Sequence, residues 1–523
     1  MNKYFLCLLI FLLSSCASIE KYNQQISKLH TPQELHEDID LAYKKLKTLH
    51  PDLYWFISKD SLDQQFSILK NSIQQPLSSI DFYKKLAPVI ASIKQGHTIV
   101  STPLRKQTKS EKKLLGKRDS PFKPFLFQKI DDKLFIKNNY GKDSTLTVGT
   151  EILSIENEPV EDLLASLQTL RTGDGYNKTF VPLIMTTYMG GYYVRTHAQK
   201  DSILITLKQS DSVYSKYLHA QYSKQGIAKK DTANTVTPKD KATKIDKKLA
   251  KKERKKRKAW EYKYAYNKYT KETGRVLKFM DNNSEKPTAY LKIQSFSPGG
   301  YKEFYKEAFK KIDSAKSENL IIDLRNNLGG QTNSIDDLYS YLVAKDYVFL
   351  DKSKMTKRMS FVYPSMHSSS WLINTGTTVL YPLLVVYSGF KVKKLDGNPY
   401  FSFKQTKPRK PKANNYKGKI YVLINGMSFS ASSIISTHLK ETKRATFVGE
   451  ETGGAYNGTI AGLTAKITLR SSKVTLRAGL LTMKTPYTAT PDGYGVKPDV
   501  HIVPTTQERD EQLDWIIGDI SKK

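Results

Sequence analysis

Short apolar runs alternate with helix-forming segments through the C-terminal half of the chain, and this alternation constrains the fold most strongly. The runs predict buried strands at Tyr290–Ile293, Leu320–Leu324, Lys419–Ile424 and Thr446–Val448. Helices are predicted between them, over Tyr301–Ala315, Thr332–Val343 and Ala431–Leu439. Buried strands separated by helices are typical of a mainly parallel sheet. Residues 286–523 are therefore predicted to form an α/β core.

Two of these predicted strands end in turns of unusual composition. The first turn contains two adjacent glycines, Gly329 and Gly330, which allow the backbone to turn sharply and expose its N–H groups. The second places Ser430 directly before a predicted helix. The N-terminus of a helix favours a developing negative charge. Together the two turns indicate a serine nucleophile beside backbone N–H donors.

The same turns carry a family resemblance. The stretch "IIDLRNNLGG" is similar to the motif D-L-R-x-N-x-G-G, and "INGMSFSASSI" followed by "FVGEETGG" resembles T-x-S-A-S-E followed by V-G-x-x-T-x-G. These are motifs of the tail-specific, or C-terminal processing, serine proteases. The resemblance implies a ClpP/crotonase-like protease core with Ser430 as the nucleophile. It also implies an oxyanion hole built from the N–H groups of Gly329 or Gly330 and of Ala431.

The base is where the chain departs from the better-known branch of that family, because Ala455 stands where that branch has its catalytic lysine. A serine at its ordinary pKa needs a base to become a nucleophile. A second branch resembles the tricorn protease core and uses a histidine in a "G-H-T" element, which His97 matches here. Its acid precedes "G-V-x-P-D", where this chain has Asp492. The resemblance thus implies a triad of Ser430, His97 and Asp492.

Two other histidines are possible alternatives to His97 as the base, and a second function is also possible. His438 follows Ser430 by two helical turns, about 12 Å, which is too far for a hydrogen bond. His367 lies in residues 347–416, where the pattern predicts no clear structure, and stays open as an alternative base. Asp323 and Arg325 are expected to hold the end of a strand. The missing lysine keeps a second function open, that of a catalytically inactive, peptide-binding lipoprotein that retains the protease fold.

Two further regions precede the core. Residues 31–110 show helical periodicity, with a capping box at Thr31, and are predicted to form a helical N-terminal region. Residues 122–212 are rich in short β-type runs. Within them, Val148–Val160 resembles the PDZ stretch "G-x-x-I-x-x-I-N-G-x-P-V". This PDZ-like, β-rich domain is expected to bind a peptide terminus by strand addition.

The first residues predict export and lipid attachment. Residues 1–15 have a basic start and an apolar run too short to span a bilayer, as in a signal peptide. The run ends in Leu13-Ser-Ser-Cys16, which resembles a lipobox and implies lipidation of Cys16, with residues 16–30 as a tether. The expected location is the cell envelope, in the periplasm or at the cell surface. Cys7 would be removed, so the mature chain can form no internal disulfide.

Much of the excess positive charge behind the formal net charge of +34 lies in a basic insertion at residues 222–275. We expect this insertion to be solvated, and contact with anionic lipid stays open as its function. No nucleic-acid module accompanies it, so nucleic acid is not a predicted partner. No metal motif, phosphate loop or dinucleotide fingerprint is present, so no metal or cofactor is predicted. The predicted function is a serine endopeptidase that hydrolyses unfolded or C-terminal protein segments through an acyl-enzyme on Ser430.

Overall fold

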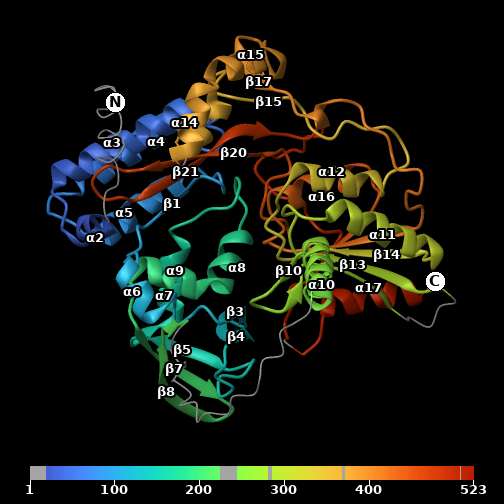
Figure 1. Ribbon diagram of the computed structural model, residues 1–523, viewed down its shortest axis with the longest axis horizontal. Coiled ribbons are helices and arrows are strands. Elements are labelled where there is room, and N and C mark those ends of the chain that lie inside the picture. The colour runs from blue at the N-terminus through green and yellow to red at the C-terminus, as the bar shows by residue number, and fades with distance from the viewer. Residues whose placement is uncertain (1–18, 224–243, 281–285, 368–370, 507, 523) are drawn as a thin grey trace.

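The computed structural model describes residues 19–223, 244–280, 286–367, 371–506 and 508–522. It confirms the predicted α/β multidomain fold, with helical and β-rich regions arranged beside a mixed core (Figure 1). Cys16 and the signal segment lie outside the described residues, and so does the first part of the basic insertion. No helix within the described ranges is both long enough and apolar enough to cross a membrane.

The core is built on a six-stranded sheet. Its strands, in spatial order, are β12 (Arg275–Met280), β13 (Thr288–Ile293), β14 (Asn319–Asp323), β18 (Lys419–Ile424), β19 (Thr446–Gly449) and β22 (Val500–His501). The pairs from β13 to β22 are parallel, and β12 is antiparallel to β13. The four predicted strands are all present in this sheet. As predicted, the sheet is therefore mainly parallel.

Helices cover both faces of this sheet. One face packs against α11 (Tyr301–Ser314), α12 (Thr332–Ser340) and α16 (Ala431–Glu441). The other face packs against α17 (Glu511–Ser521), through residues that include Ile321, Leu423 and Ile516. Because side chains alternate along a strand, neighbouring residues of β14 serve opposite faces. Burial on both faces explains why these strands are continuous apolar runs in the sequence.

The N-terminal region contains α2 (Ile19–Ser27), α3 (Pro32–Leu49), α4 (Lys59–Asn71) and α5 (Ser79–Ala91). Thr31 and Glu34 form the predicted capping box at the start of α3. The predicted helical region 31–110 also contains a strand, β1 (Ile99–Ser101), and the start of α6 (Lys109–Leu115). Strand β1 pairs antiparallel with β21 (Thr475–Met483). This pairing joins the N-terminal region to the C-terminal half of the chain.

Strand β21 belongs to a second sheet. Its order is β1, β21, β15 (Ser353–Lys354), β17 (Asn398–Phe401) and β16 (Val392–Leu395), with β20 (Thr459–Thr468) also paired to β21. The segment between β15 and β16, which the sequence pattern left uninterpreted, contains η1 (Ser360–Val362), α13 (Tyr363–Met366), α14 (Trp371–Val379) and α15 (Tyr381–Lys391). Helices α14 and α15, separated by Leu380 alone, lie at the edge of the molecule (Figure 1), in a segment that leaves the second sheet after β15 and returns to it at β16. A short helix, η2 (Lys404–Thr406), follows β17.

The middle region is an antiparallel sheet ordered β3 (Phe125–Ile130), β4 (Lys133–Asn139), β5 (Glu151–Ile155), β7 (Ser202–Gln209) and β8 (Ser212–His219), with β6 (Glu158–Pro159) beside β5. Helices α7 (Val160–Gln168), α8 (Phe180–Thr187) and α9 (Met189–Thr196) share its apolar core. A pair of short strands, β2 (Arg118–Asp119) and β9 (Gln221–Tyr222), closes the region. Its identity as a PDZ domain stays a prediction.

The described part of the basic insertion contains α10 (Lys244–Lys263), followed by the paired strands β10 (Tyr266–Asn267) and β11 (Glu272–Thr273). Side chains at positions 249–260 of α10 are exposed. The exposure agrees with a solvated, charged segment.

Candidate active site

Ser430 lies at the turn between β18 and α16, where its φ of 58° and ψ of −115° are rare for a residue other than glycine. Two neighbouring serines hold this turn in place. The Oγ of Ser428 donates to the Leu324 carbonyl, and that of Ser432 donates to the Asn327 carbonyl, each at 2.8 Å. Of the three serines, only Ser430 lines the adjacent pocket.

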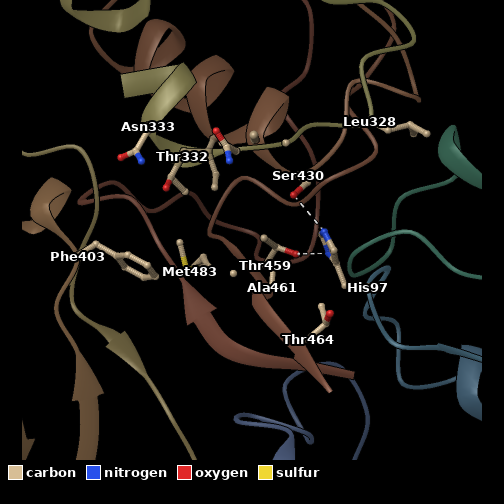
Figure 2. Close-up of a pocket in the computed structure, with 15 residues that line it drawn as sticks. His97, Leu328, Thr332, Asn333, Phe403, Ser430, Thr459, Ala461, Thr464 and Met483 are labelled. Carbon is tan, nitrogen blue, oxygen red and sulfur yellow. Dashed lines mark hydrogen bonds between the residues drawn. The ribbon is translucent and has the colours of Figure 1, made fainter. Parts of the chain in front are cut away.

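His97 points at this serine. Its Nε2 lies 3.1 Å from the Ser430 Oγ (Figure 2), and its ring stacks on Phe429. His97 follows α5 and lies two residues before the start of β1, whose Ile99 is paired with Arg477 of β21. The structure thus brings together the predicted nucleophile and the predicted base, although 333 positions separate them.

The surroundings of His97 keep its ring neutral. Burial, together with the positive charges of Arg477 and Arg171, lowers the pKa of His97 to about 3. At neutral pH the imidazole therefore carries a lone pair, which is the form that can accept a proton from a serine.

Asp492 does not contact His97. Its exposed carboxylate accepts hydrogen bonds from the indole Nε1 of Trp55 at 2.7 Å and from the Gly493 N–H at 2.6 Å. The residue stands at the motif position of the acid, but its side chain points outward. Its hydrogen bond with Trp55 links the loop after α3 to the core. The prediction of Asp492 as the partner of His97 is corrected by this geometry.

A different pair of residues lies behind the histidine. The Oγ1 of Thr459, the first residue of β20, lies 3.2 Å from His97 Nδ1 (Figure 2). Asp174, in the loop between α7 and α8, is fully buried and accepts the Gly96 N–H at 2.8 Å. Burial raises the pKa of Asp174 to about 6, although the Gly96 amide and the Thr459 hydroxyl act in the opposite direction.

The second oxygen of Asp174, Oδ2, forms no hydrogen bond of normal geometry within the described ranges. The Thr459 hydroxyl lies near enough to this carboxylate to lower its pKa, although the two groups do not meet hydrogen-bond geometry. A hydroxyl can accept from one neighbour and donate to another. Thr459 is thus placed to link the His97 ring to a buried carboxylate.

Sequence reasoning missed Asp174 and Thr459. Asp174 stands between Gly173 and Gly175, a pattern typical of an ordinary turn. Thr459 has the composition of any strand residue. Neither belongs to the motifs around Ser430, and no local signal could have connected them with His97.

Backbone donors next to Ser430 complete the arrangement. Of the three predicted donors, Gly329 is not available, because its N–H donates to Asn327 Oδ1 at 2.9 Å. The N–H groups of Gly330 and Ala431 have no hydrogen-bond partner in the described part of the chain, and both residues line the pocket. A Cβ at position 330 would lie 2.3 Å from the carbonyl carbon of Phe296, so only glycine fits there. These two amides are the candidate oxyanion hole.

Comparison with known families agrees with this geometry. Residues 287–502 match the model of peptidase family S41. The core of this chain belongs to peptidase family S41. Comparison with curated proteins finds no match.

Solved structures resemble the chain over nearly its whole length. The structure of mature CPAF has 16% identity, covers 94% of this chain and 97% of its own, and has a TM-score of 0.59. Mature CPAF complexed with lactacystin has 15% identity, covers 94% and 98%, and has the same TM-score of 0.59. The photosystem II D1 C-terminal processing protease has 12% identity, covers 93% and 98%, and has a TM-score of 0.42. The likeness to CPAF shows that the regions around the S41 core follow a known arrangement.

The pocket of the S41 core has a volume of about 400 Å³ and lies between Ser430 and the second sheet. The apolar side chains of Phe403 and Met483 line the part away from His97 (Figure 2), and Ile434 also lines the pocket. None of the lining residues in the described ranges is a lysine. Ala455 is buried and bridges to Gly495. His97 is therefore the basic side chain that reaches Ser430.

The remaining candidates of the S41 core have structural contacts. His438 is buried, and its Nε2 lies 2.8 Å from the Phe349 carbonyl. His367 is exposed and stacks on Tyr363, outside the pocket. Asp323 and Arg325 form a buried ion pair that extends to Asp510 and holds the end of β14. No cluster of three or more metal-ligating side chains occurs among the described residues.

Proposed function

We propose that this protein is a serine endopeptidase that hydrolyses peptide bonds in unfolded or C-terminal protein segments through an acyl-enzyme on Ser430. The observation that carries the proposal is the 3.1 Å contact between Ser430 Oγ and His97 Nε2. Two unpartnered backbone N–H groups, those of Gly330 and Ala431, line the same pocket. Nucleophile, base and oxyanion donors are the parts that acyl transfer requires.

The reaction would follow the usual two halves of acyl transfer. Ser430 Oγ attacks the scissile carbonyl carbon while His97 Nε2 takes the hydroxyl proton. The carbonyl oxygen becomes an anion that the N–H groups of Gly330 and Ala431 stabilise, each contributing about 3 kcal/mol. The intermediate then releases the amine, which receives the proton from His97. A water molecule, activated by the same ring, hydrolyses the ester and restores Ser430.

Thr459 and Asp174 act in this scheme as positioning residues. When His97 Nε2 serves as the base, the ring proton must be on Nδ1, and the Thr459 hydroxyl is placed to accept it. The negative charge of Asp174 would favour the imidazolium that forms during attack. This charge would act against those of Arg477 and Arg171, which disfavour the cation.

A fluorophosphonate serine probe tests the proposal directly, because it labels only activated serines. We expect one label per chain, located on Ser430 by peptide mass spectrometry, and competition by an unfolded protein substrate. Absence of labelling in a folded preparation would favour the alternative of an inactive peptide-binding protein with a protease fold.

Replacing Asp174 by Asn tests the positioning role. A carboxylate that contacts the histidine directly contributes about 10⁴-fold to kcat, and we expect a smaller loss here, about 10- to 100-fold, because a hydroxyl intervenes. In the wild type, kcat/KM should fall as the pH drops through about 6, where the carboxylate becomes protonated. In Asp174→Asn, kcat/KM should not change near pH 6 and should stay at the value that the wild type reaches at lower pH.

Stability should change in the opposite direction. A buried acid whose folded pKa is raised destabilises the fold increasingly as the pH rises from its unfolded pKa, about 4, to its folded pKa, about 6, because over that interval the unfolded chain releases a proton that the folded chain keeps. At pH 8, Asp174→Asn should therefore raise the free energy of unfolding by up to about 3 kcal/mol, which is measured as a higher apparent Tm. Below pH 4 it should have no such effect. Asp492→Asn is the matched control and should leave activity unchanged. If Asp492→Asn lost activity and Asp174→Asn did not, Asp174 would not be the positioning residue of His97.

The regions around the core suggest how a substrate is presented. The apolar part of the pocket suits an apolar substrate side chain next to the scissile bond. The PDZ-like domain would hold a peptide terminus by strand addition. We further propose that the mature chain is lipid-anchored at Cys16 in the cell envelope, which the lipobox-like stretch supports. Contact of the basic insertion with anionic lipid would fit the same location.

A further inference from the structure

The connection from β15 to β16 leaves the second sheet and returns to it, and this helical hairpin exposes large apolar side chains on α14 and α15 at the edge of the molecule (Figure 1). Five of them are more than 60% exposed: Leu372, Val379, Leu383, Val386 and Phe390. Single exposed apolar residues are ordinary, but a contiguous exposed apolar surface marks a site of interaction.

The exposed residues of α15 are not confined to one side of the helix. Val385, Val386 and Tyr387 are consecutive, so they point in directions about 100° apart, and all three are exposed. A helix that meets water on its outer face normally has polar residues there. A helix that is apolar on all sides requires an apolar environment on all sides, and a flat protein partner would cover only one.

Charge changes sharply along the hairpin. Residues 359–390 contain no Asp, Glu, Lys or Arg, and residues 352–395 contain no acidic residue at all. Cations stand at both ends, with Lys357 and Arg358 before the hairpin and Lys393 and Lys394 after it, all four exposed. An apolar tip with a cationic base matches a bilayer surface, where anionic phosphates lie above the acyl chains.

The hairpin is fixed to the protein at its base. Arg358 Nε donates to the buried Ser388 Oγ at 3.0 Å, and the rings of Phe361 and Tyr387 meet edge to face at 6.0 Å. These contacts fix the direction in which the hairpin projects. With 11 residues, α15 is about 16 Å long, which is half the thickness of the hydrocarbon core.

We propose that the α14–α15 hairpin inserts into one leaflet of a bilayer with anionic headgroups, with the cations at its base on the lipid phosphates. The insertion does not depend on peptidase activity. It would hold the protein in a fixed orientation at the membrane surface.

Vesicle flotation tests this inference on the full-length chain with Cys16→Ser, so that no variant carries lipid at that residue. The vesicles contain phosphatidylcholine and phosphatidylglycerol in equal amounts. We expect Val379→Glu/Leu383→Glu to lower the bound fraction at least about tenfold, because both residues are exposed at the end away from the base and two charges would enter the acyl region. The matched control, Leu114→Glu/Val213→Glu, replaces exposed apolar residues elsewhere and should change binding less than about twofold.

Several outcomes would overturn the inference. Equal binding of both double variants would show that the hairpin does not enter the bilayer. Light scattering that shows loss of a dimer in the hairpin variant, with vesicle binding unchanged, would make this surface an interface between copies. Undiminished binding to vesicles of phosphatidylcholine alone would exclude the role of the basal cations. Fluorophosphonate labelling of each variant is a separate readout, because it follows Ser430 and not the membrane.

Discussion

Ser430→Ala should lower kcat for peptide hydrolysis by at least about 10⁴-fold while the protein stays folded. The hydroxyl is the only part of residue 430 that could attack a carbonyl, and its loss leaves just the binding and oxyanion contributions. The Ser430 side chain makes no capping hydrogen bond to α16, so its removal should cost little stability. Activity is measured on an unfolded protein substrate, and folding by the apparent Tm.

Two controls make this result specific. The double variant Ser430→Ala/His97→Gln should be no worse than the single variant, because residues that act as one unit do not contribute additively. Activity that survives in Ser430→Ala at more than one part in a hundred would remove Ser430 from the mechanism.

His97→Gln should reduce kcat by a similar factor, roughly 10⁴-fold or more, and should abolish fluorophosphonate labelling. Glutamine keeps a polar group at this position but cannot accept the serine proton. His367→Gln is the matched control, and we expect full activity because that ring lies outside the pocket. Normal turnover by His97→Gln would mean that another group activates Ser430.

The same variant should alter the stability of the protein in acid. The folded-state pKa of His97 is lowered to about 3, so between that pH and about 6.5 the unfolded chain binds a proton that the folded chain does not. This difference favours unfolding as the pH falls through that interval. His97→Gln lacks the contribution, and its apparent Tm should decrease less between pH 7 and pH 4 than that of the wild type.

The core strands and the pair of Ser430 and His97 could be predicted from sequence because each depends on a local pattern. Buried parallel strands are continuous apolar runs, as at Lys419–Ile424, and burial on both faces causes this. The serine and the histidine each stand inside a short motif. Their contact followed from the family resemblance, since nothing local relates position 97 to position 430.

The acidic partner could not be predicted in the same way. A motif gives the place of Asp492 in the chain but not the direction of its side chain, which turns to Trp55. Asp174 reaches the site through a loop of the middle region, and its burial depends on packing among three separate segments. The distinction between Gly329 and Gly330 is likewise three-dimensional, because it depends on the hydrogen bond that the Gly329 N–H donates to Asn327 Oδ1.

The helices of the hairpin could not be predicted from the sequence for another reason. Its apolar residues are interrupted by Thr, Gly and Pro, so neither a strand nor an amphipathic helix is indicated. Sequence rules assume that apolar residues end up inside the protein. Where they face outward on all sides, periodicity carries no signal.

The pairing of β1 with β21 makes reactivity conditional on folding of the whole chain. Until Ile99 is in register with Arg477, the alcohol on residue 430 has no proton acceptor, however well the C-terminal half has folded. A chain still being synthesised, or one cut between these segments, would therefore be harmless to its neighbours. Completion of the tertiary structure would then be the step that brings the two side chains together.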